Sequence, residues 1–402
     1  MRSTPLGPER RPPHRHRAVV AGLAVVLALA GVLMPAGPAR RLAPRGDSGV
    51  RLELGPALET PPFARATAAR EYRLPDDHGP HLDYQTEWWY YTGTLASDDG
   101  ARFGFQLTFF RRGLSPGSPP AGPGLSTNQI YFAHLAVTDV AEGTHTFAER
   151  WSRGAGGWAG ATGDPFAVWL EDWRVESTSP DGHAVRLVAG EGPLRLDLDL
   201  ESRKPLARHG ERGLSPKSDE PGNASHYIGY TRLGARGRLA SGGREIAVSG
   251  LAWFDHEWST SALGPGAVGW DWLSLQLDDG RELMYFQIRR EDGGVEPVSG
   301  GTVVARDGAA RRLPAREVVL SVLDRWTSPH TAATYPSRWR LRVPGEGLDL
   351  LVEPAMADQE MRTSFVYWEG AVRVSGRQEG RAVTGQGYVE LTGYARSMQG
   401  VF

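Results

Sequence analysis

The sequence predicts an all-β protein made of antiparallel sheets that close as barrels or sandwiches. Three observations carry this prediction. Apolar and polar residues alternate over most of the chain beyond residue 84, turn sequences separate the alternating runs, and one hairpin pattern occurs twice. No stretch of three helical turns has an apolar stripe. We therefore expect few helices, all short, with the best candidates at residues 314–323 and 354–362.

The alternating runs have the period of two that places every second side chain on one face of a strand. Phe103, Phe105, Leu107 and Phe109 alternate with polar or small residues, and residues 194–200 carry a leucine at every second position. Asp-Gly and Ser-Gly-Gly sequences, which favour tight turns, lie between such runs. Many short strands joined by close turns are typical of antiparallel barrels and sandwiches.

The repeated hairpin pattern suggests that the chain contains two related halves. An aromatic-rich strand at 88–95 leads to the turn Asp98-Asp99-Gly100, and another at 270–277 leads to Asp278-Asp279-Gly280. Each return strand contains Phe-Gln, at 105–106 and at 286–287. Two barrels in tandem would produce this pattern, although Asp-Gly hairpins also arise independently.

Composition excludes several classes of protein. Hydrophobic residues make up 40% of the 402 residues, charged residues 23%, and the formal net charge is −2. These values argue against a disordered chain, a multi-span membrane protein and a nucleic-acid-binding surface. The absence of cysteine excludes disulfides, cysteine-ligated zinc, iron–sulfur clusters and a thiol nucleophile. We expect neither a cofactor nor a bound metal.

The N-terminal segment has the features of a secretory signal. Residues 1–17 contain five arginines, residues 18–33 carry no charge, and residues 35–39 are small or proline. We expect a signal peptide at 1–39, a linker at 40–71, and export to the periplasm or the medium. An uncleaved N-terminal membrane anchor is the alternative, and association with a membrane surface stays open.

One string of titratable residues stands out as a candidate for acid–base chemistry. Asp255, His256 and Glu257 follow one another between aromatic residues and precede Trp258. Burial among aromatic rings raises the pKa of a carboxyl group and lowers that of a histidine, unless the groups pair with one another, and a site can acquire an acid or a base in this way. The alternative is a strand at a domain junction, where Asp255 and His256 satisfy each other. A zinc peptidase motif is excluded because Thr260 stands where the second histidine is required.

Other aromatic and polar groups could form the mouth of a ligand pocket or an aromatic core with a carboxylate at its rim. They are Glu87, Trp88, Trp89 and Tyr91 in one segment, Trp270, Asp271 and Trp272 in a second, and Tyr285 and Gln287 on one face of a third. A match to the nucleophile elbow at 113–117 is rejected because prolines follow it where a helix is required.

These motifs together resemble the AttH / carotenoid 1,2-hydratase superfamily. The similarity rests on residues 86–93, on residues 254–259, and on residues 269–272 followed by 275–280, and it covers roughly residues 72–398. It implies two lipocalin-like barrels in tandem, at 72–256 and 257–402. The chain is most similar to the exported AttH branch, described as predicted secreted hydrolases. The carotenoid branch adds water across an isoprenoid double bond, starting with protonation.

The resemblance implies an exported enzyme with hydratase-, hydrolase- or cyclase-like chemistry on a hydrophobic, isoprenoid or polyene-like small molecule. Asp255, His256, Glu257 and Tyr285 are then the catalytic candidates, and the aromatic segments with Gln287 and Trp258 would bind the ligand. The chain departs from the hydratase pattern at Gln287, where that branch has an aspartate that can donate a proton. A non-catalytic carrier of a lipophilic ligand is the alternative.

Overall fold

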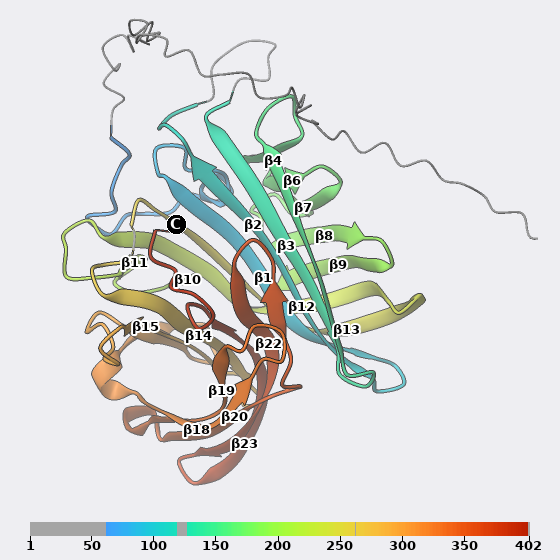
Figure 1. Cartoon of the computed structure of the whole chain (residues 1–402), viewed down its shortest axis with the longest axis vertical. Coiled ribbons are helices and arrows are strands. Elements are labelled where there is room, and N and C mark those ends of the chain that lie inside the picture. Colours follow the sequence, from blue (N-terminus) through green and yellow to red (C-terminus); the bar gives the residue numbers. More distant parts are fainter. Residues whose placement is uncertain (1–61, 119–126, 262, 401–402) are drawn as a thin grey trace, which may run out of the picture. The chain divides into compact units, whose positions relative to one another are not determined.

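The computed structural model describes residues 62–118, 127–261 and 263–400, which form two antiparallel sheets in succession along the chain (Figure 1). The predicted signal peptide and most of the predicted linker lie outside the described residues. Residues 62–71, the end of that linker, have no regular secondary structure. No helix within the described ranges is long and apolar enough to cross a membrane.

The first sheet contains thirteen strands among the described residues, in the order β4-β3-β2-β1-β13-β12-β9-β8-β7-β6-β5, with β10 and β11 also paired to β12. Its strands are β1 (Thr86–Ser97), β2 (Arg102–Gly113), β3 (Gln129–Asp139), β4 (Thr144–Arg153), β5 (Ala159–Thr162), β6 (Ala167–Leu170), β7 (Trp173–Ser177), β8 (Ala184–Glu191), β9 (Leu194–Ser202), β10 (Ala207–Arg208), β11 (Leu214–Pro216), β12 (Ala224–Ser241) and β13 (Arg244–Ser259).

The second sheet contains ten strands among the described residues, in the order β17-β16-β15-β14-β23-β22-β20-β19-β18, with β21 paired to β22. Its strands are β14 (Ala267–Leu277), β15 (Glu282–Arg290), β16 (Gly300–Val304), β17 (Ala310–Pro314), β18 (Val319–Thr327), β19 (Thr334–Val343), β20 (Leu348–Pro354), β21 (Glu360–Arg362), β22 (Val366–Gln378) and β23 (Arg381–Leu391).

Both sheets curl into barrel-like structures, and their strand orders correspond. β1 pairs with β2 through the first Asp-Asp-Gly turn and with β13, the last strand of its sheet. β14 pairs with β15 through the second such turn and with β23, again the last strand. The repeated hairpin therefore occupies the same place in both halves, and the prediction of two antiparallel barrels in tandem is confirmed. The first sheet ends at Ser259, three residues after the expected boundary at 256/257, and the second begins at Ala267.

The expected short helices are mostly absent from the described residues. Three 3₁₀ turns occur: η1 (Asp76–His78), η2 (Ala315–Glu317) and η3 (Pro344–Glu346). The prediction of helix at 314–323 was wrong except for η2, since β18 follows it and pairs with β19. The prediction at 354–362 was wrong because β21 pairs there with β22. In both places the pairing with a neighbouring strand imposes an extended backbone on a sequence that begins with a proline.

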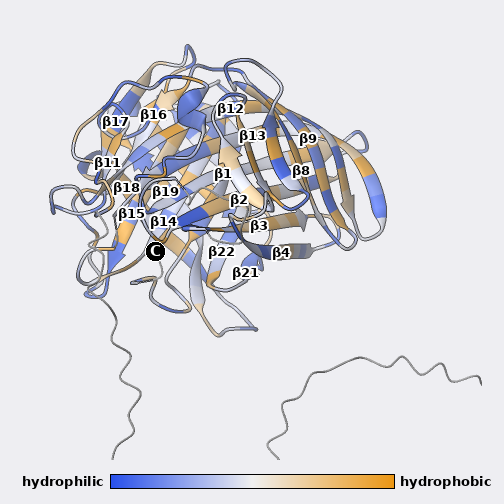
Figure 2. Cartoon of the chain, turned by 90° about the horizontal axis from the view of Figure 1, so that it is seen from above, coloured by the Kyte–Doolittle hydropathy of each residue, from blue (hydrophilic) through white to orange (hydrophobic). Residues whose placement is uncertain are grey.

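Alternation places the apolar side chains inside each barrel and, at some strands, between the barrels. It is seen along β8 and β9, where hydrophilic and hydrophobic residues succeed one another (Figure 2). One buried cluster fills the first barrel and a second fills the other. A third cluster lies between the two sheets and includes Tyr90, Tyr227, Trp272, Phe286 and Tyr388.

The two sheets approach each other closely beside the third cluster. A Cβ atom at Gly104 in β2 would lie only 2.7 Å from the Cβ atom of Ala371 in β22. Such a separation is shorter than any van der Waals contact between carbon atoms, so glycine is required at this position. This contact helps to fix the space between the barrels, where the candidate site lies.

Candidate functional site

A cavity of about 130 Å³ lies between the two sheets. Strands β1, β2, β12 and β13 contribute to its wall from the first sheet, and β14, β15 and β23 from the second. Seven of the seventeen lining residues are aromatic, and carboxyl groups enter the wall from both sheets. The lining side chains are Thr86, Trp88, Tyr90, Phe110, Lys217, Tyr227, Asp255, Glu257, Ser259, Ser261, Leu263, Trp270, Trp272, Phe286, Ile288, Glu390 and Met398.

Asp255 is held in a fixed orientation on the first-sheet side of the cavity. The Tyr227 hydroxyl donates to its Oδ2 at 2.5 Å, and the Trp253 indole donates to its Oδ1 at 2.9 Å. Trp272, from the second sheet, donates in turn to the Tyr227 oxygen at 3.0 Å. Two hydrogen-bond donors on one carboxylate restrict its movement, as a positioned base requires.

Glu257 lies two residues further along β13 and faces the same cavity. Its carboxylate accepts a hydrogen bond from Ser225 and forms an ion pair with Lys217. The Lys217 ammonium also lies 4.9 Å from the centre of the Phe286 ring, a cation–π distance. The charge of Glu257 is therefore compensated within the wall of the cavity.

Glu390 enters the cavity from β23 of the second sheet. The Trp270 indole donates to its Oε2 at 2.7 Å. Burial, together with the charges of Glu257 and Asp255, raises the pKa of Glu390 to about 7, against the opposing effect of the hydrogen bond from Trp270. At neutral pH this carboxyl group is thus present in both its protonated and ionised forms, which suits a group that donates a proton.

Glu369 is a second carboxyl group beside Glu390. The two residues are direct partners in the register of β22 and β23. Tyr90 donates a hydrogen bond to Glu369 Oε1 at 2.5 Å, and Oε2 has no hydrogen-bond partner among the described residues. Burial and the neighbouring Glu390 charge raise the pKa of Glu369 well above its usual value. The protonated form of Glu369 is therefore favoured, which lessens the negative charge behind the cavity.

The period of two along the strands separates the sequence-predicted residues onto different faces. The structure brings Asp255, Glu257, Trp88, Trp270 and Trp272 to the cavity. His256 and Trp258 point to the other face of β13, and Glu87, Trp89 and Tyr91 to the other face of β1. Trp89 and Tyr91 are buried in the core of the first barrel.

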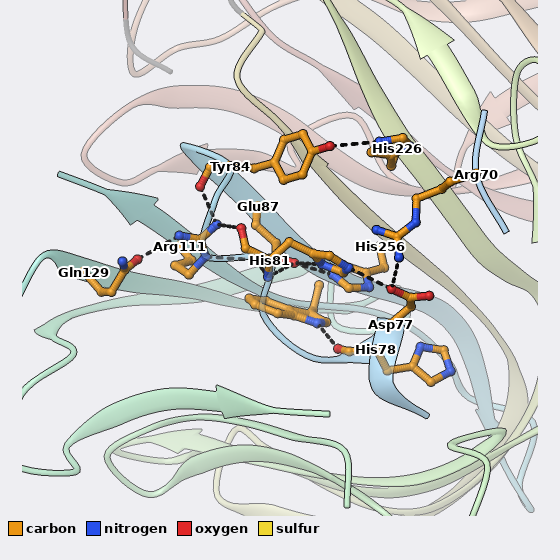
Figure 3. Close-up of polar contacts among 11 residues, drawn as sticks. Arg70, Asp77, His78, His81, Tyr84, Glu87, Arg111, Gln129, His226 and His256 are labelled. Carbon is orange, nitrogen blue, oxygen red and sulfur yellow. Dashed lines mark hydrogen bonds and ion pairs between the residues drawn. The ribbon is translucent and has the colours of Figure 1, made fainter. Parts of the chain in front are cut away.

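The network around Glu87 occupies that other face (Figure 3). The buried Glu87 carboxylate accepts hydrogen bonds from Arg111 Nε at 2.9 Å, His256 Nε2 at 2.9 Å and His81 Nδ1 at 2.8 Å. Burial alone would raise its pKa, but the charges of Arg111 and His81 and these hydrogen bonds outweigh that effect and lower it. Trp258 stacks on His81 with ring centres 3.7 Å apart. The network fastens the segment before β1 to the first barrel.

Three of these side chains have the spacing of a metal site. Ligand atoms of His81, Glu87 and His256 lie within 4.8 Å of one another. However, His81 Nε2 also contacts Asp77 at 3.2 Å, so both ring nitrogens of His81 donate to carboxylates and the ring is protonated. Burial would lower the His81 pKa, but Glu87 and Asp77 raise it. Together with Arg111, this imidazolium already neutralises both carboxylates, so the residues fit an internal ion-pair network better than a cation site.

The remaining sequence-predicted residues lie away from the cavity. Asp271 accepts hydrogen bonds from Gln287 at 2.8 Å, Arg289 at 2.8 Å and Tyr394 at 3.0 Å, on the opposite face of β14 from Trp270 and Trp272. Tyr285 is buried in the core of the second barrel, where burial raises its pKa to about 12. The structure thus gives Asp271 and Gln287 a common hydrogen-bonded cluster and gives Tyr285 a place in the core.

Sequence reasoning missed Glu390, Glu369, Tyr227 and Lys217. A signal for the two glutamates exists, because each interrupts an apolar and aromatic strand, in Tyr-Val-Glu-Leu at 388–391 and in Tyr-Trp-Glu-Gly at 367–370. A carboxyl group in the middle of a buried strand must be paired or neutral, and both cases indicate a special environment.

The fold and the cavity define a class of protein, the tandem lipocalin-like proteins with a polar and aromatic cavity between two barrels. A family model described as AttH-like matches residues 65–394. The chain belongs to this family.

Several solved structures are similar to the chain, among them the following two. A crystal structure of a protein of Nitrosomonas europaea assigned to AttH is 34% identical, with a TM-score of 0.73, covering 83% of this chain and 100% of its own. Kievitone hydratase from Nectria haematococca is 15% identical, with a TM-score of 0.63, covering 83% of this chain and 98% of its own. No curated protein matches the chain.

Proposed function

We propose that the protein is an enzyme that protonates an electron-rich double bond of a hydrophobic small molecule in the cavity between the barrels, so that water addition or ring closure follows. The observation that carries this proposal is the environment of the Glu390 carboxyl group. It is a carboxyl group with a pKa of about 7 in an aromatic cavity, and it faces a hydrogen-bonded carboxylate, Asp255. This pairing of a proton donor with a proton acceptor is the arrangement that general acid–base catalysis requires.

The reaction begins when the Glu390 carboxyl group transfers its proton to one carbon of the double bond. The π electron pair forms the new C–H bond, and the other carbon becomes a cation. The aromatic rings of Trp88, Tyr90, Trp272 and Phe286 line the cavity and would stabilise that cation through cation–π attraction. Because Glu369 favours its protonated form, the charge at the cavity wall comes from Asp255, Glu257 and Lys217.

Asp255 completes the reaction on the opposite side. When water attacks the cation, Asp255 takes one of its protons, and the product is an alcohol formed by net addition of one water molecule. When a second double bond of the substrate attacks instead, Asp255 removes a proton from carbon and the product is a cyclic isomer. In both cases Glu390 ends ionised and Asp255 ends protonated, and exchange with solvent restores the starting state.

The fold neighbours support this assignment in general terms. Kievitone hydratase is a hydratase by name and shares the fold, so the proposal of water addition is consistent with it. His256, expected from the sequence to assist the acid–base pair, takes no part in the proposed reaction because it faces Glu87. We also propose export, on the strength of residues 1–39, and N-terminal sequencing of the secreted protein would test it.

Deuterium labelling tests the proposal for any substrate of this chemical class. A lipophilic extract of the source organism is incubated in D₂O with the wild type, with Glu390→Gln, and with Glu353→Gln as a matched control on the partly exposed strand β20. Mass spectrometry should find a compound that gains one carbon-bound deuterium, with or without the mass of one water, with the wild type and the control only.

Two outcomes would contradict the proposal. Deuterium labelling by Glu390→Gln at the wild-type rate would show that Glu390 is not the proton donor. A compound that co-purifies with the protein and is never labelled would instead identify a carrier of a lipophilic ligand.

A further inference from the structure

A larger groove of about 620 Å³ adjoins the cavity. Thr86, Phe110 and Met398 line both spaces, so the groove and the cavity are neighbours. The inner cavity, at about 130 Å³, is smaller than the roughly 300–1,000 Å³ typical of ligand pockets. It can therefore enclose only the reacting part of a ligand of usual size, and the rest must lie in the groove.

One side of the groove is a ladder of aromatic rings from three neighbouring strands. Phe110 stacks on Phe132 with ring centres 4.4 Å apart, and Phe132 stacks on Trp151 at the same distance. These residues are direct partners in the registers of β2, β3 and β4. Phe365 meets the rings of Phe110 and Phe132 edge-on. Because Trp151 is 50% exposed, the ladder offers a flat apolar surface that reaches solvent.

The charge of the groove is positive. Among the described residues, three arginines and no acidic residue line it. Arg111 is neutralised by Glu87, as described above. Arg112 is only partly exposed, donates to the Thr86 hydroxyl at 3.0 Å, and has no ion pair with any carboxylate in the described part of the chain. Burial lowers the pKa of Arg112. A guanidinium that is partly desolvated and lacks a counter-ion favours an oxyanion beside it.

We propose that the groove is an outer subsite that binds an oxyanion group of the substrate, a carboxylate in the first instance, at Arg112. The substrate class is then an elongated amphipathic acid. Its unsaturated apolar part reaches Glu390, and its anionic group lies at the boundary between the cavity and the groove, with the aromatic ladder beside it. This inference rests on the proposed function for the position of the reacting part, but the binding of the anion can be tested alone.

The test compares an acid with its ester. cis-Parinaric acid, a fluorescent polyene carboxylate, and its methyl ester are titrated against the wild type, Arg112→Gln, Arg112→Lys and Arg102→Gln. Arg102 is a matched control because it lies on the same strand but outside the groove. We expect the wild type to bind the acid about tenfold more tightly than the ester, the value of one charge-assisted hydrogen bond. Arg112→Gln should abolish this difference, while Arg112→Lys and Arg102→Gln should keep most of it.

Further arms separate the possible outcomes. Dodecyl phosphate and dodecanoate compete against the bound probe, which shows whether the subsite prefers a phosphate or a carboxylate. Should Arg112→Gln fail to fold, the wild type is titrated at high salt instead. The difference in affinity between acid and ester should then disappear, since salt screens a partly exposed ion pair. Equal binding of acid and ester to the wild type would overturn the subsite.

Failure of the subsite is distinguishable from failure of the proposed function. Glu390→Gln should keep the preference for the acid over the ester, whatever its effect on the affinity for both probes, because Glu390 lines the cavity and not the groove. Deuterium labelling of a neutral compound, together with equal binding of acid and ester, would support the proposed enzyme activity and contradict the anion subsite. Tighter binding of the acid than of the ester, without deuterium labelling of any compound, would support the anion subsite and contradict the enzyme activity. The protein would then be a carrier.

Discussion

Glu369 and Glu390 stand directly opposite each other on β22 and β23, yet only Glu390 reaches the cavity. The Tyr90 hydroxyl donates a hydrogen bond to Glu369. Burial and the charge of Glu390 raise the pKa of Glu369. Two carboxyl groups so close together cannot both ionise readily. The pair therefore stores a proton at neutral pH beside a space that a ligand can enter.

The first prediction concerns stability and pH. The folded protein holds the Glu390 proton with a pKa of about 7, while the ordinary value is 4.5, so the folded state binds it more tightly than the unfolded chain. This contribution to stability is complete below pH 4.5 and is lost as the pH rises through about 7. The melting temperature of the wild type should fall between pH 5 and pH 8 more steeply than that of Glu390→Gln. Parallel curves would mean that Glu390 titrates normally.

The second prediction concerns the Glu87 network. Glu87→Gln leaves Arg111 without its buried counter-ion and leaves the protonated His81 with Asp77 alone. The free energy of unfolding should fall by about 3–5 kcal/mol, as for other broken buried ion pairs. Urea denaturation measures this loss, and Glu353→Gln, whose ion pair with Arg338 is partly exposed, should change little. A loss of deuterium labelling in the folded Glu87→Gln protein would instead place Glu87 in the reaction.

The third prediction separates two neighbours in the chain, Asp255 and His256. Asp255→Asn should slow deuterium labelling by about 10²–10⁴-fold, the usual contribution of a general base, with its hydrogen-bonded position largely kept. His256→Phe should leave the labelling rate of the folded protein unchanged. It should lower the free energy of unfolding by about 1–3 kcal/mol, because Glu87 loses a buried donor. The reverse pattern would assign the chemistry to the first barrel.

The fourth prediction compares two neighbouring tryptophans. Trp88→Ala removes an aromatic wall of the cavity, so binding of cis-parinaric acid should weaken by about tenfold while stability changes little. Trp89→Ala empties part of the core of the first barrel, so the free energy of unfolding should fall by about 3–5 kcal/mol. Fluorescence titration and urea denaturation of both variants check this contrast. Equal loss of binding per folded molecule would show that the cavity extends across β1.

Period-two alternation was sufficient to predict antiparallel sheets, because a strand that packs on one face must repeat every two residues, while the repeated hairpin and the family resemblance indicated two barrels in tandem. The same rule limited the prediction of the site. Asp255, His256 and Glu257 are contiguous in the sequence, and a strand must send His256 to the opposite side from its neighbours. The aromatic strings thus identified β1, β13 and β14 as the strands of the site, while only some of their side chains face the cavity.

The second carboxyl side of the cavity could not be predicted from local sequence. Glu390 is far from Asp255 along the chain, and only the packing of the second sheet on the first brings them to one space. The environment that raises the Glu390 pKa, namely burial and the charges of Asp255 and Glu257, is a property of that packing. The edge strand β18 was mistaken for helix for a related reason, since its exposed side chains carry little alternation and its pairing with β19 decides its conformation.

The aromatic residues between the sheets form a cluster separate from the cores of both barrels. Natural selection on substrate choice can therefore act through Tyr90, Trp272 and Phe286, while selection on folding acts through the two cores. Substitutions in the cavity need not be matched by compensating changes inside either barrel. Members of this family can in this way diverge in the molecules they recognise while they keep one architecture.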